Sequence, residues 1–330
     1  MSEFDLIQRY FTRSTPSAEL GIGDDAALLR IRAGMDLAIS TDMLVSGTHF
    51  FSDADPAQLG HKTLAVNLSD LAAMGATPRW ATLALSLPNA NEAWLKKFSE
   101  GFFALADQHG VELIGGDTTR GPLNLCVTIL GEVPQGAALK RSGAQIGNDI
   151  WVSGYLGDAA LALAHLQDKV QLLAADFALC AHALNQPTPR LALGIALRGV
   201  ASSAIDISDG LLADLGHILE SSGVGAEISF DDLPISSLLR NFLISPECAL
   251  QSKKGEGTSF FQRCILAGGD DYELCFTAHI AHRDTIEDLA HQINLPLARI
   301  GTIVKGSGCI VRSADGSIIQ TGESGFDHFL

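Results

Sequence analysis

The sequence has few basic residues, and this shortage limits what the protein can bind. Lys and Arg number 22 against 38 Asp and Glu, so the formal net charge is −16 and the isoelectric point is near 4.9. Because binding to a phosphate backbone needs basic surface, we expect no nucleic-acid partner. A phosphorylated small molecule stays possible, since cations can bridge it to acidic protein groups.

Long apolar runs are also missing. No stretch approaches the ~20 apolar residues that cross a membrane, and the start MSEFDLIQRYF lacks the basic and then apolar pattern of a signal peptide. The six cysteines form no C-x-x-C pair and have neither zinc-site nor haem-attachment spacing. We interpret them as reduced core thiols and expect a cytoplasmic protein without a membrane partner.

The common phosphate-binding signatures are absent too. The chain has no G-x-x-x-x-G-K-[ST] loop, no G-x-G-x-x-G in a strand–helix frame, and neither H-R-D nor D-F-G. If the protein transfers phosphoryl groups, it belongs to neither the P-loop nor the protein-kinase class.

What is present indicates a globular protein of two domains. The chain has 330 residues, 47% apolar and 18% charged, which is enough for a large core. The glycine-rich stretch 136–150 is the candidate linker, and we place the domains at 1–140 and 141–330. Alternating patterns predict mixed α/β layers. The expected strands are 35–45, 81–88, 111–116, 125–133 and 151–155, and the expected helices are 56–74, 92–110, one from Asp158 and one following QPTPR (186–190).

Residues 203–223 are predicted to pass from a strand through a turn into a helix that Gly223 ends. The polar stretch 251–259 is predicted to be a surface loop.

Several carboxylates lie where surface charge is a poor explanation. Asp24 and Asp25 follow a Gly-Ile-Gly turn, and Asp42 ends an apolar strand beside Ser40 and Thr41. Asp70 lies in a strongly apolar helix. Buried carboxylates are costly unless cations or several donors accompany them.

Spacing groups these acids with other polar residues. Thr63, Asn67 and Asp70 share one face of the predicted helix, and strand alternation puts Asp206 and Ser208 on one face. Asp209 stands where the next helix begins. Each acid also has a structural interpretation: Asp209 as a helix N-cap, Asp42 in an Asx-turn, and Asp70 bonded to a loop.

Taken together, these hard oxygen donors suit Mg²⁺, which binds one or two carboxylates together with substrate phosphates. Two glycine-rich segments, LIGGDTTRG (113–121) and LAGGDDYELC (266–275), are predicted turns. Glycines there would let backbone N–H groups approach phosphate oxygens closely.

Seven segments, in this order, resemble the thiamine-monophosphate kinase family nearly end to end. They are GIGDDAALL, AISTDMLVSGTHF, AVNLSDLAAMGATP, LIGGDTTRG, LKRSGAQIGN, AIDISDGLLADLGHI and GGDDYELCF. The resemblance implies the two-domain fold of the aminoimidazole ribonucleotide synthetase superfamily. It also implies ATP-dependent conversion of thiamine monophosphate to thiamine diphosphate, several Mg²⁺ ions, and a homodimer whose core is formed by the N-terminal sheets.

The family's site residues carry over position by position. The implied metal ligands are Asp25, Ser40, Thr41, Asp42, Asp70, Asp206 and Asp209. The implied nucleotide contacts are Gly116, Asp117, Arg141 and Ser208, and the implied substrate contacts are His49 and Asp270.

The chain departs from the family pattern at three places, one of which is a longer loop at 251–259 without an assigned role. Asp270 stands where the family turn often has Glu, which shortens the reach to the substrate by one methylene. Glu323, the third implied substrate contact, stands where relatives often have an aromatic residue before G-[YF]-D-H-F and offers no ring to stack on the thiamine.

The expected mechanism needs no general base. The acceptor phosphate has a second pKa of about 6 and is largely ionised at neutral pH. Alignment and Mg²⁺ electrostatics should therefore carry direct in-line transfer, with Arg141 and Arg120 offsetting nucleotide charge. The alternatives are another ATP-using enzyme of the same fold that makes an acyl or carbamoyl phosphate, a nucleotide-binding signalling module suggested by GGDDYE, and a non-catalytic metal-dependent scaffold.

Overall fold

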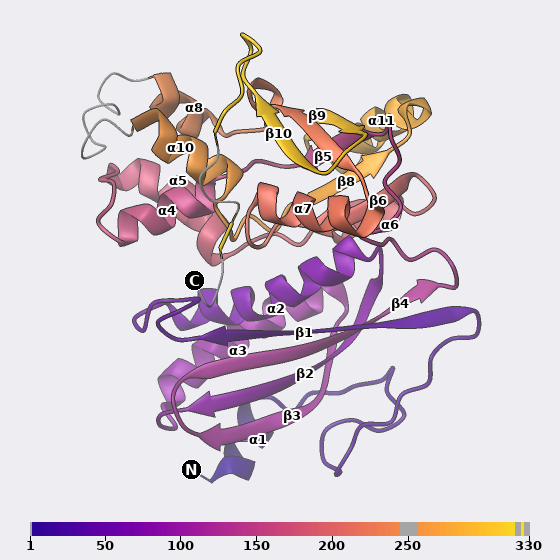
Figure 1. Cartoon of the computed structure of the whole chain (residues 1–330). Coiled ribbons are helices and arrows are strands. Elements are labelled where there is room, and N and C mark those ends of the chain that lie inside the picture. The colour runs from indigo at the N-terminus through magenta and orange to yellow at the C-terminus, as the bar shows by residue number, and fades with distance from the viewer. Residues whose placement is uncertain (1, 245–256, 321–324, 327–330) are drawn as a thin grey trace. The chain divides into compact units, whose positions relative to one another are not determined.

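A computed structural model describes residues 2–244, 257–320 and 325–326. The chain divides into two compact units (Figure 1), which are described here one at a time. The N-terminal unit comprises Met1–Leu71 and Gly75–Ala138, and the C-terminal unit comprises Ala72–Met74 and Leu139–Leu330.

The described strands of the N-terminal unit form a four-stranded sheet in the order β1-β4-β2-β3. Strands β1 and β2 are antiparallel to β4, whereas β2 and β3 are parallel. Both β1 and β3 are therefore edge strands. The bounds are β1 Met35–Val45, β2 Thr77–Leu87, β3 Glu112–Arg120 and β4 Asn124–Pro134.

Three helices accompany this sheet: α1 Glu3–Tyr10, α2 Pro56–Ala73 and α3 Glu92–His109. Helices α2 and α3 approach so closely that only glycine fits at the contact. A Cβ atom at Gly60 would lie 2.1 Å from the carbonyl oxygen of Phe98, and one at Gly101 would lie 1.9 Å from that of Ala57. Helix α3 ends at the left-handed Gly110, as the sequence predicts.

The two faces of this sheet differ in burial. Along β4, Leu125, Val127 and Ile129 are fully buried on the inner face. On the outer face of β1, Ile39 and Met43 are 59% and 55% exposed. The alternation follows the strand period of two, and in the described part of the chain it leaves these two apolar side chains exposed on the outer face.

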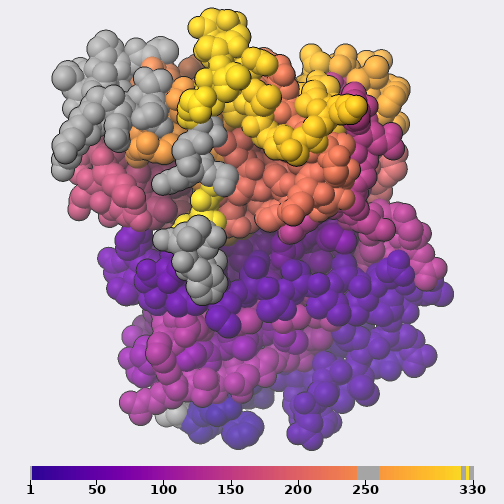
Figure 2. All heavy atoms as spheres, in the orientation of Figure 1, coloured from indigo at the N-terminus to yellow at the C-terminus, as the bar shows by residue number. Residues whose placement is uncertain are grey.

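The described strands of the C-terminal unit form a six-stranded sheet in the order β10-β7-β9-β5-β8-β6. The helix α7 follows β6 and ends at the left-handed Gly223. The chain that follows β10 projects as a narrow turn, yellow in Figure 2 and closed by a hydrogen bond from Ser313 N to Ser317 O. The strands are β5 Asp149–Ser153, β6 Ala201–Asp206, β7 Gly225–Ser229, β8 Leu274–Ala278, β9 Leu297–Val304 and β10 Gly308–Arg312. The α-helices are α4 Asp158–Leu166, α5 Ala174–Asn185, α6 Leu191–Ala196, α7 Leu211–Ser222, α8 Ser237–Ile244, α10 Gly257–Leu266 and α11 Arg283–Ile293, and the 3₁₀ turns are η1 Phe230–Asp232 and η2 Ile280–His282.

Three sequence expectations need correction. The predicted turn at 113–121 is wrong, because β3 continues to Arg120. A register shift opposite Ala81 and Thr82 keeps the glycine-containing segment paired with β2. The strand expected at 81–88 begins earlier, at Thr77. The predicted loop 251–259 falls partly outside the described residues, and its last three residues begin α10.

Two expectations of absence can be stated only for the part of the chain that the structure describes. There, no helix is long and apolar enough to cross a membrane. The cysteines described there are all free thiols.

Candidate functional site

One cluster of predicted site residues joins β1 to α2. Ser40 Oγ donates a hydrogen bond of 2.5 Å to Asp70 Oδ2, and Asp42 N donates to Asn67 Oδ1 at 3.1 Å. Asn67 Nδ2 in turn donates to Thr63 O at 3.0 Å. Asn67 and Asp70 of the polar stripe predicted on α2 therefore face the strand that carries Ser40 and Asp42, whereas Thr63 Oγ1 donates to Leu59 O within the helix.

Two other predicted residues near this cluster are oriented differently. The Thr41 hydroxyl lies on the outer face of β1, 2.8 Å from the Thr128 hydroxyl, whereas Ser40 and Asp42 point inward. His49 Nδ1 accepts a hydrogen bond of 3.0 Å from Val45 N. In the neutral ring this contact puts the proton on Nε2, which makes Nε2 a donor.

A second group of predicted residues lies at the opposite edge of the sheet. Residues 19–30 form a hairpin in which Leu28 N donates to Leu20 O at 2.9 Å. At its exposed tip, Asp24 Oδ1 accepts from Asp25 N at 3.1 Å, so Asp24 helps to shape the turn. Asp25, Gly116 and Asp117 line one cavity of about 890 Å³ between this tip, α1, β2 and β3.

Gly116 has a backbone role in this cavity. Its φ is +148°, and a Cβ atom there would lie 1.9 Å from Leu83 O. Any larger residue would push β3 away from β2, so the glycine fixes where Asp117 meets the cavity.

The two groups do not meet within one chain. Strand β1 and strand β3 are separated by β4 and β2, and neighbouring strands lie about 4.8 Å apart, so the two edges are about 14 Å apart. Among the described residues, no three or more His, Cys, Asp or Glu side chains gather into a group that could hold a metal. The carboxylates are instead distributed over two edges of one sheet and a turn of the other unit.

The C-terminal unit holds its predicted residues in a tightly bonded turn. Strand β6 ends at Asp206, so the alternation expected to put Asp206 and Ser208 on one strand face does not extend to Ser208. Asp214 Oδ2 accepts hydrogen bonds from Ser208 N, Asp209 N and Gly210 N at 3.0, 3.0 and 3.2 Å. The N-cap of α7 is Gly210, so the alternative of Asp209 as the N-cap is wrong.

Asp214 supports this turn from inside the unit. Burial raises its pKa to about 7, helped by the negative charges of Asp206 and Asp209, although the backbone N–H groups oppose the rise. The acids Asp206 and Asp209 therefore stand beside a third carboxyl that keeps their backbone fixed.

The segment 268–273 packs against the same turn. Asp270 N donates to Ser208 O at 2.9 Å, and Tyr272 N donates to Ile207 O at 2.8 Å. Asp270 and Tyr272 both have positive φ, +68° and +49°. A Cβ atom at Gly269 would lie 2.4 Å from Ser208 O, so glycine is required for this approach.

Arg141 and the C-terminal motif complete the set of predicted residues. Arg141 is exposed, and its carbonyl oxygen accepts from Ser222 Oγ at 3.4 Å. Of the C-terminal motif, Phe326 N donates to Asp209 O at 3.0 Å. Glu323 lies outside the described residues.

Sequence reasoning missed three acids that hold these segments. Asp214 was hidden in the apolar run LLADLGHIL, Asp271 accepts from Gly157 N at 3.0 Å, and Glu273 pairs with Arg190. Burial raises the pKa of Asp271 well above its ordinary value. Their partners lie many residues away, except for Asp214, whose position four residues after Gly210 at the start of a helix was the one local signal.

Comparison with known proteins covers nearly the whole chain. Residues 23–133 match the N-terminal domain of AIR synthase related proteins, and residues 145–313 match the C-terminal domain. Thiamine-monophosphate kinase of Escherichia coli K12 is 48% identical over 336 residues, covering 99% of this chain and 98% of the E. coli chain.

Two solved structures support the same assignment. Thiamine-monophosphate kinase from Stenotrophomonas maltophilia K279a has a TM-score of 0.82 at 50% identity and covers 96% of both chains. AaThiL in complex with AMPPCP and TMP has a TM-score of 0.76 at 28% identity, covering 99% of this chain and 96% of its own.

Proposed function

The chain belongs to the thiamine-monophosphate kinase family, and from that premise we propose how its residues phosphorylate thiamine monophosphate with ATP to give thiamine diphosphate. The observation that carries the function is the full-length match to E. coli thiamine-monophosphate kinase. The related AaThiL binds AMPPCP and TMP, an ATP analogue and a phosphate-bearing acceptor.

We propose Mg²⁺ as the metal. The candidate ligands carry only carboxylate and hydroxyl oxygens, and the 2.5 Å contact between Ser40 and Asp70 brings two such donors together. Hard oxygen donors fit Mg²⁺, which would neutralise phosphate charge when bound. The proposed ligands are Asp25, Ser40, Thr41, Asp42, Asp70, Asp206 and Asp209.

The candidate site residues that are not metal ligands, Ser208 among them, bind and orient the two substrates. Backbone N–H groups beside Gly116, the hydroxyl of Ser208, Asp117 and the exposed Arg141 hold the nucleotide. The Nε2 donor of His49 and the carboxylate of Asp270 contact thiamine monophosphate. Glu323 contacts it as well, in place of the aromatic residue of relatives.

Transfer is direct and in line. The acceptor phosphate has a pKa of about 6 and is already a nucleophile at neutral pH, so no side chain acts as general base. The rigid turn at 206–209 and the backbone of 268–273 keep their acids in place during transfer.

The functional molecule is a cytoplasmic homodimer, because ATP is supplied there and the outer face of β1 is apolar and exposed at Ile39 and Met43. A two-fold pairing of the N-terminal sheets would let the Asp117 edge of one copy meet the Asp42 edge of the other.

A mixing experiment tests this arrangement. Asp42→Asn and Asp117→Asn would each abolish activity alone. Mixed after co-refolding, they should recover about a quarter of wild-type activity, since half of the dimers then hold one intact site. No recovery, with dimers present, would place both acids in a site of one chain.

The central test is an assay of purified protein with ATP and either thiamine monophosphate or free thiamine, with and without Mg²⁺. Formation of thiamine diphosphate only from the monophosphate and only with Mg²⁺ is the expected result. Folded protein that forms no product with Mg²⁺ present would overturn the proposal in favour of another ATP-using member of the fold.

A further inference from the structure

The acidic hairpin at 19–30 has little to hold its tip in place. Gly23, Asp24 and Asp25 are exposed, and within the tip the contacts are the bond from Asp25 N to Asp24 and a backbone bridge between Ile22 and Asp24. The stem adds backbone bonds between Leu20 and Leu28. Exposed backbone bonds open easily, so the position of Asp25 depends on how the two arms of the hairpin are anchored.

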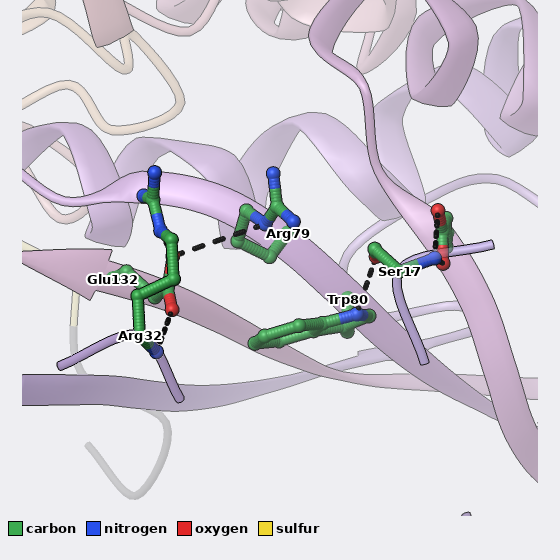
Figure 3. A network of polar contacts seen from close by, with 6 residues as sticks. Ser17, Arg32, Arg79, Trp80 and Glu132 are labelled. Carbon is green, nitrogen blue, oxygen red and sulfur yellow. Dashed lines mark hydrogen bonds and ion pairs between the residues drawn. The ribbon is translucent and has the colours of Figure 1, made fainter. Parts of the chain in front are cut away.

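The sheet anchors both arms through carboxylates (Figure 3). Two residues before the first arm, Ser17 N donates to Glu112 Oε1 at 3.0 Å, and Ser17 Oγ accepts from Trp80 Nε1 at 2.8 Å. Two residues after the second arm, Arg32 N donates to Glu132 Oε1 at 2.9 Å and Arg32 Nε donates to Glu132 Oε2 at 2.6 Å. The guanidinium and the backbone of Arg32 thus grip one carboxylate.

Glu132 is suited to this role because it is itself fixed. It is 1% exposed in β4, between Leu37 of β1 and Thr77 of β2. Arg79 Nε lies 3.9 Å from Glu132 Oε2, which leaves a second cation near the carboxylate. A charged, buried and immobile acceptor is a firm attachment point for a loop that lacks a core of its own.

We propose that Glu132 and Arg32 are positioning residues that hold Asp25 at the cavity beside Gly116 and Asp117. This inference rests on the proposed function, in which Asp25 is a metal ligand. Groups that hydrogen-bond a metal ligand directly typically change metal affinity about 10- to 100-fold when removed. Arg32 acts through seven residues of chain, so the lower end of that range applies.

Arg32→Ala is the informative variant, because it keeps the backbone bond and leaves Arg79 beside Glu132. Arg30→Ala is its matched control: Arg30 Nε donates to Glu19 Oε1 at 2.6 Å, which joins the two arms to each other but not to the sheet. Each variant removes one arginine from the same stretch of chain: Arg30 ends the hairpin and Arg32 follows it by two residues.

The first readout is Mn²⁺ binding by electron paramagnetic resonance, without substrates. Arg32→Ala should weaken the tightest binding about tenfold, Arg30→Ala should stay within about twofold, and Arg32→Lys should recover part of the loss. Hydrogen exchange at the amides of Leu20 and Leu28 should be faster in Arg32→Ala than in Arg30→Ala. In turnover, the Mg²⁺ concentration for half-maximal rate should rise in Arg32→Ala while the KM for thiamine monophosphate stays unchanged.

Wild-type Mn²⁺ affinity in Arg32→Ala, or an equal loss in Arg30→Ala, would overturn the positioning role. These results are distinguishable from failure of the proposed function. An inactive wild-type protein whose Mn²⁺ binding still depends on Arg32 would remove the kinase reaction and leave the positioning role standing.

Discussion

Each unit holds a site segment with one buried Glu–Arg pair, and the two pairs differ in their surroundings. In the N-terminal unit Glu132 binds Arg32 beside the Asp25 hairpin. In the C-terminal unit Glu273 Oε2 accepts from Arg190 Nε at 2.6 Å, and Oε1 accepts from Arg190 Nη2, three residues after Asp270. Glu273 also accepts from Ser153 Oγ at 2.5 Å.

The pKa values of the two glutamates shift in opposite directions. Burial raises the pKa of Glu132, but the Arg32 hydrogen bonds and the charges of Arg32 and Arg79 outweigh it and hold the pKa below its ordinary value. For Glu273 burial dominates, and the pKa is raised despite Arg190 and Ser153. The Arg32 side chain is 55% exposed and the Arg190 side chain is 22% exposed. The pair that keeps its glutamate charged is thus the one whose arginine is more exposed, and its glutamate also accepts a backbone N–H and has Arg79 nearby.

The largest effect should come from breaking the more buried pair. Arg190→Met would leave Glu273 buried without its cation, so the free energy of unfolding should fall by about 3–5 kcal/mol. Arg32→Met should cost about 1–2 kcal/mol, because the Arg32 backbone and Arg79 stay with Glu132. Urea denaturation of both variants measures the difference, and equal losses would mean that exposure of the arginine does not set the cost.

A smaller effect is expected in how stability depends on pH, because the two glutamates contribute to it in opposite directions. The lowered pKa of Glu132 gives stability that is present above its unfolded value of 4.5 and is lost as pH falls through the lower folded pKa. The raised pKa of Glu273 acts oppositely: the folded state binds the extra proton, so stability rises as pH falls through the folded pKa toward 4.5.

Glu132→Gln should therefore be less stable than wild type at neutral pH, and this difference in unfolding free energy should disappear in acid. The unfolding free energy of Glu273→Gln should fall further below that of wild type over the same fall in pH. Urea midpoints from about pH 7 to about pH 3 measure both differences. Parallel curves for the two variants would contradict the opposite pKa directions.

The sequence predicts the local elements of this fold well, because their signals are local. The strand 35–45 and the helices that end at Gly110 and Gly223 follow from periodicity and capping. Segment 113–121 was missed for the same reason. Its glycines and hydroxyls are typical of a turn, yet pairing with β2 extends the strand through a register shift that only the partner strand reveals.

Site residues follow the same division. The stripe of Thr63, Asn67 and Asp70 was predictable because the helical period fixes a face, whatever the partner. The partners of Glu132 and Glu273 lie 100 and 83 residues away, and no local pattern pairs them. The resemblance named the residues that meet substrates but not the buried acids that hold them.

Asp149 tests whether the opposite pKa shifts of Glu132 and Glu273 depend on which unit holds the acid or on how exposed its arginine is. It lies in the C-terminal unit, is 1% exposed, and bonds Arg283 Nε at 2.6 Å, with Arg299 Nη1 at 3.6 Å. Burial raises its pKa, but hydrogen bonds and charge from Arg283, with Arg299, hold the pKa below its ordinary value, as at Glu132. Both arginine side chains are more than 40% exposed.

If solvent access to the arginine is the cause, Arg299→Ala should cost only about 0–1 kcal/mol of unfolding free energy, because its contact is long and screened by water. The same urea titration measures it beside Arg190→Met. A cost near that of Arg190→Met would show that the C-terminal unit penalises any loss of a cation from a buried acid. A small cost would leave the exposure of the arginine as the property that distinguishes the Glu273 pair from the Glu132 and Asp149 pairs.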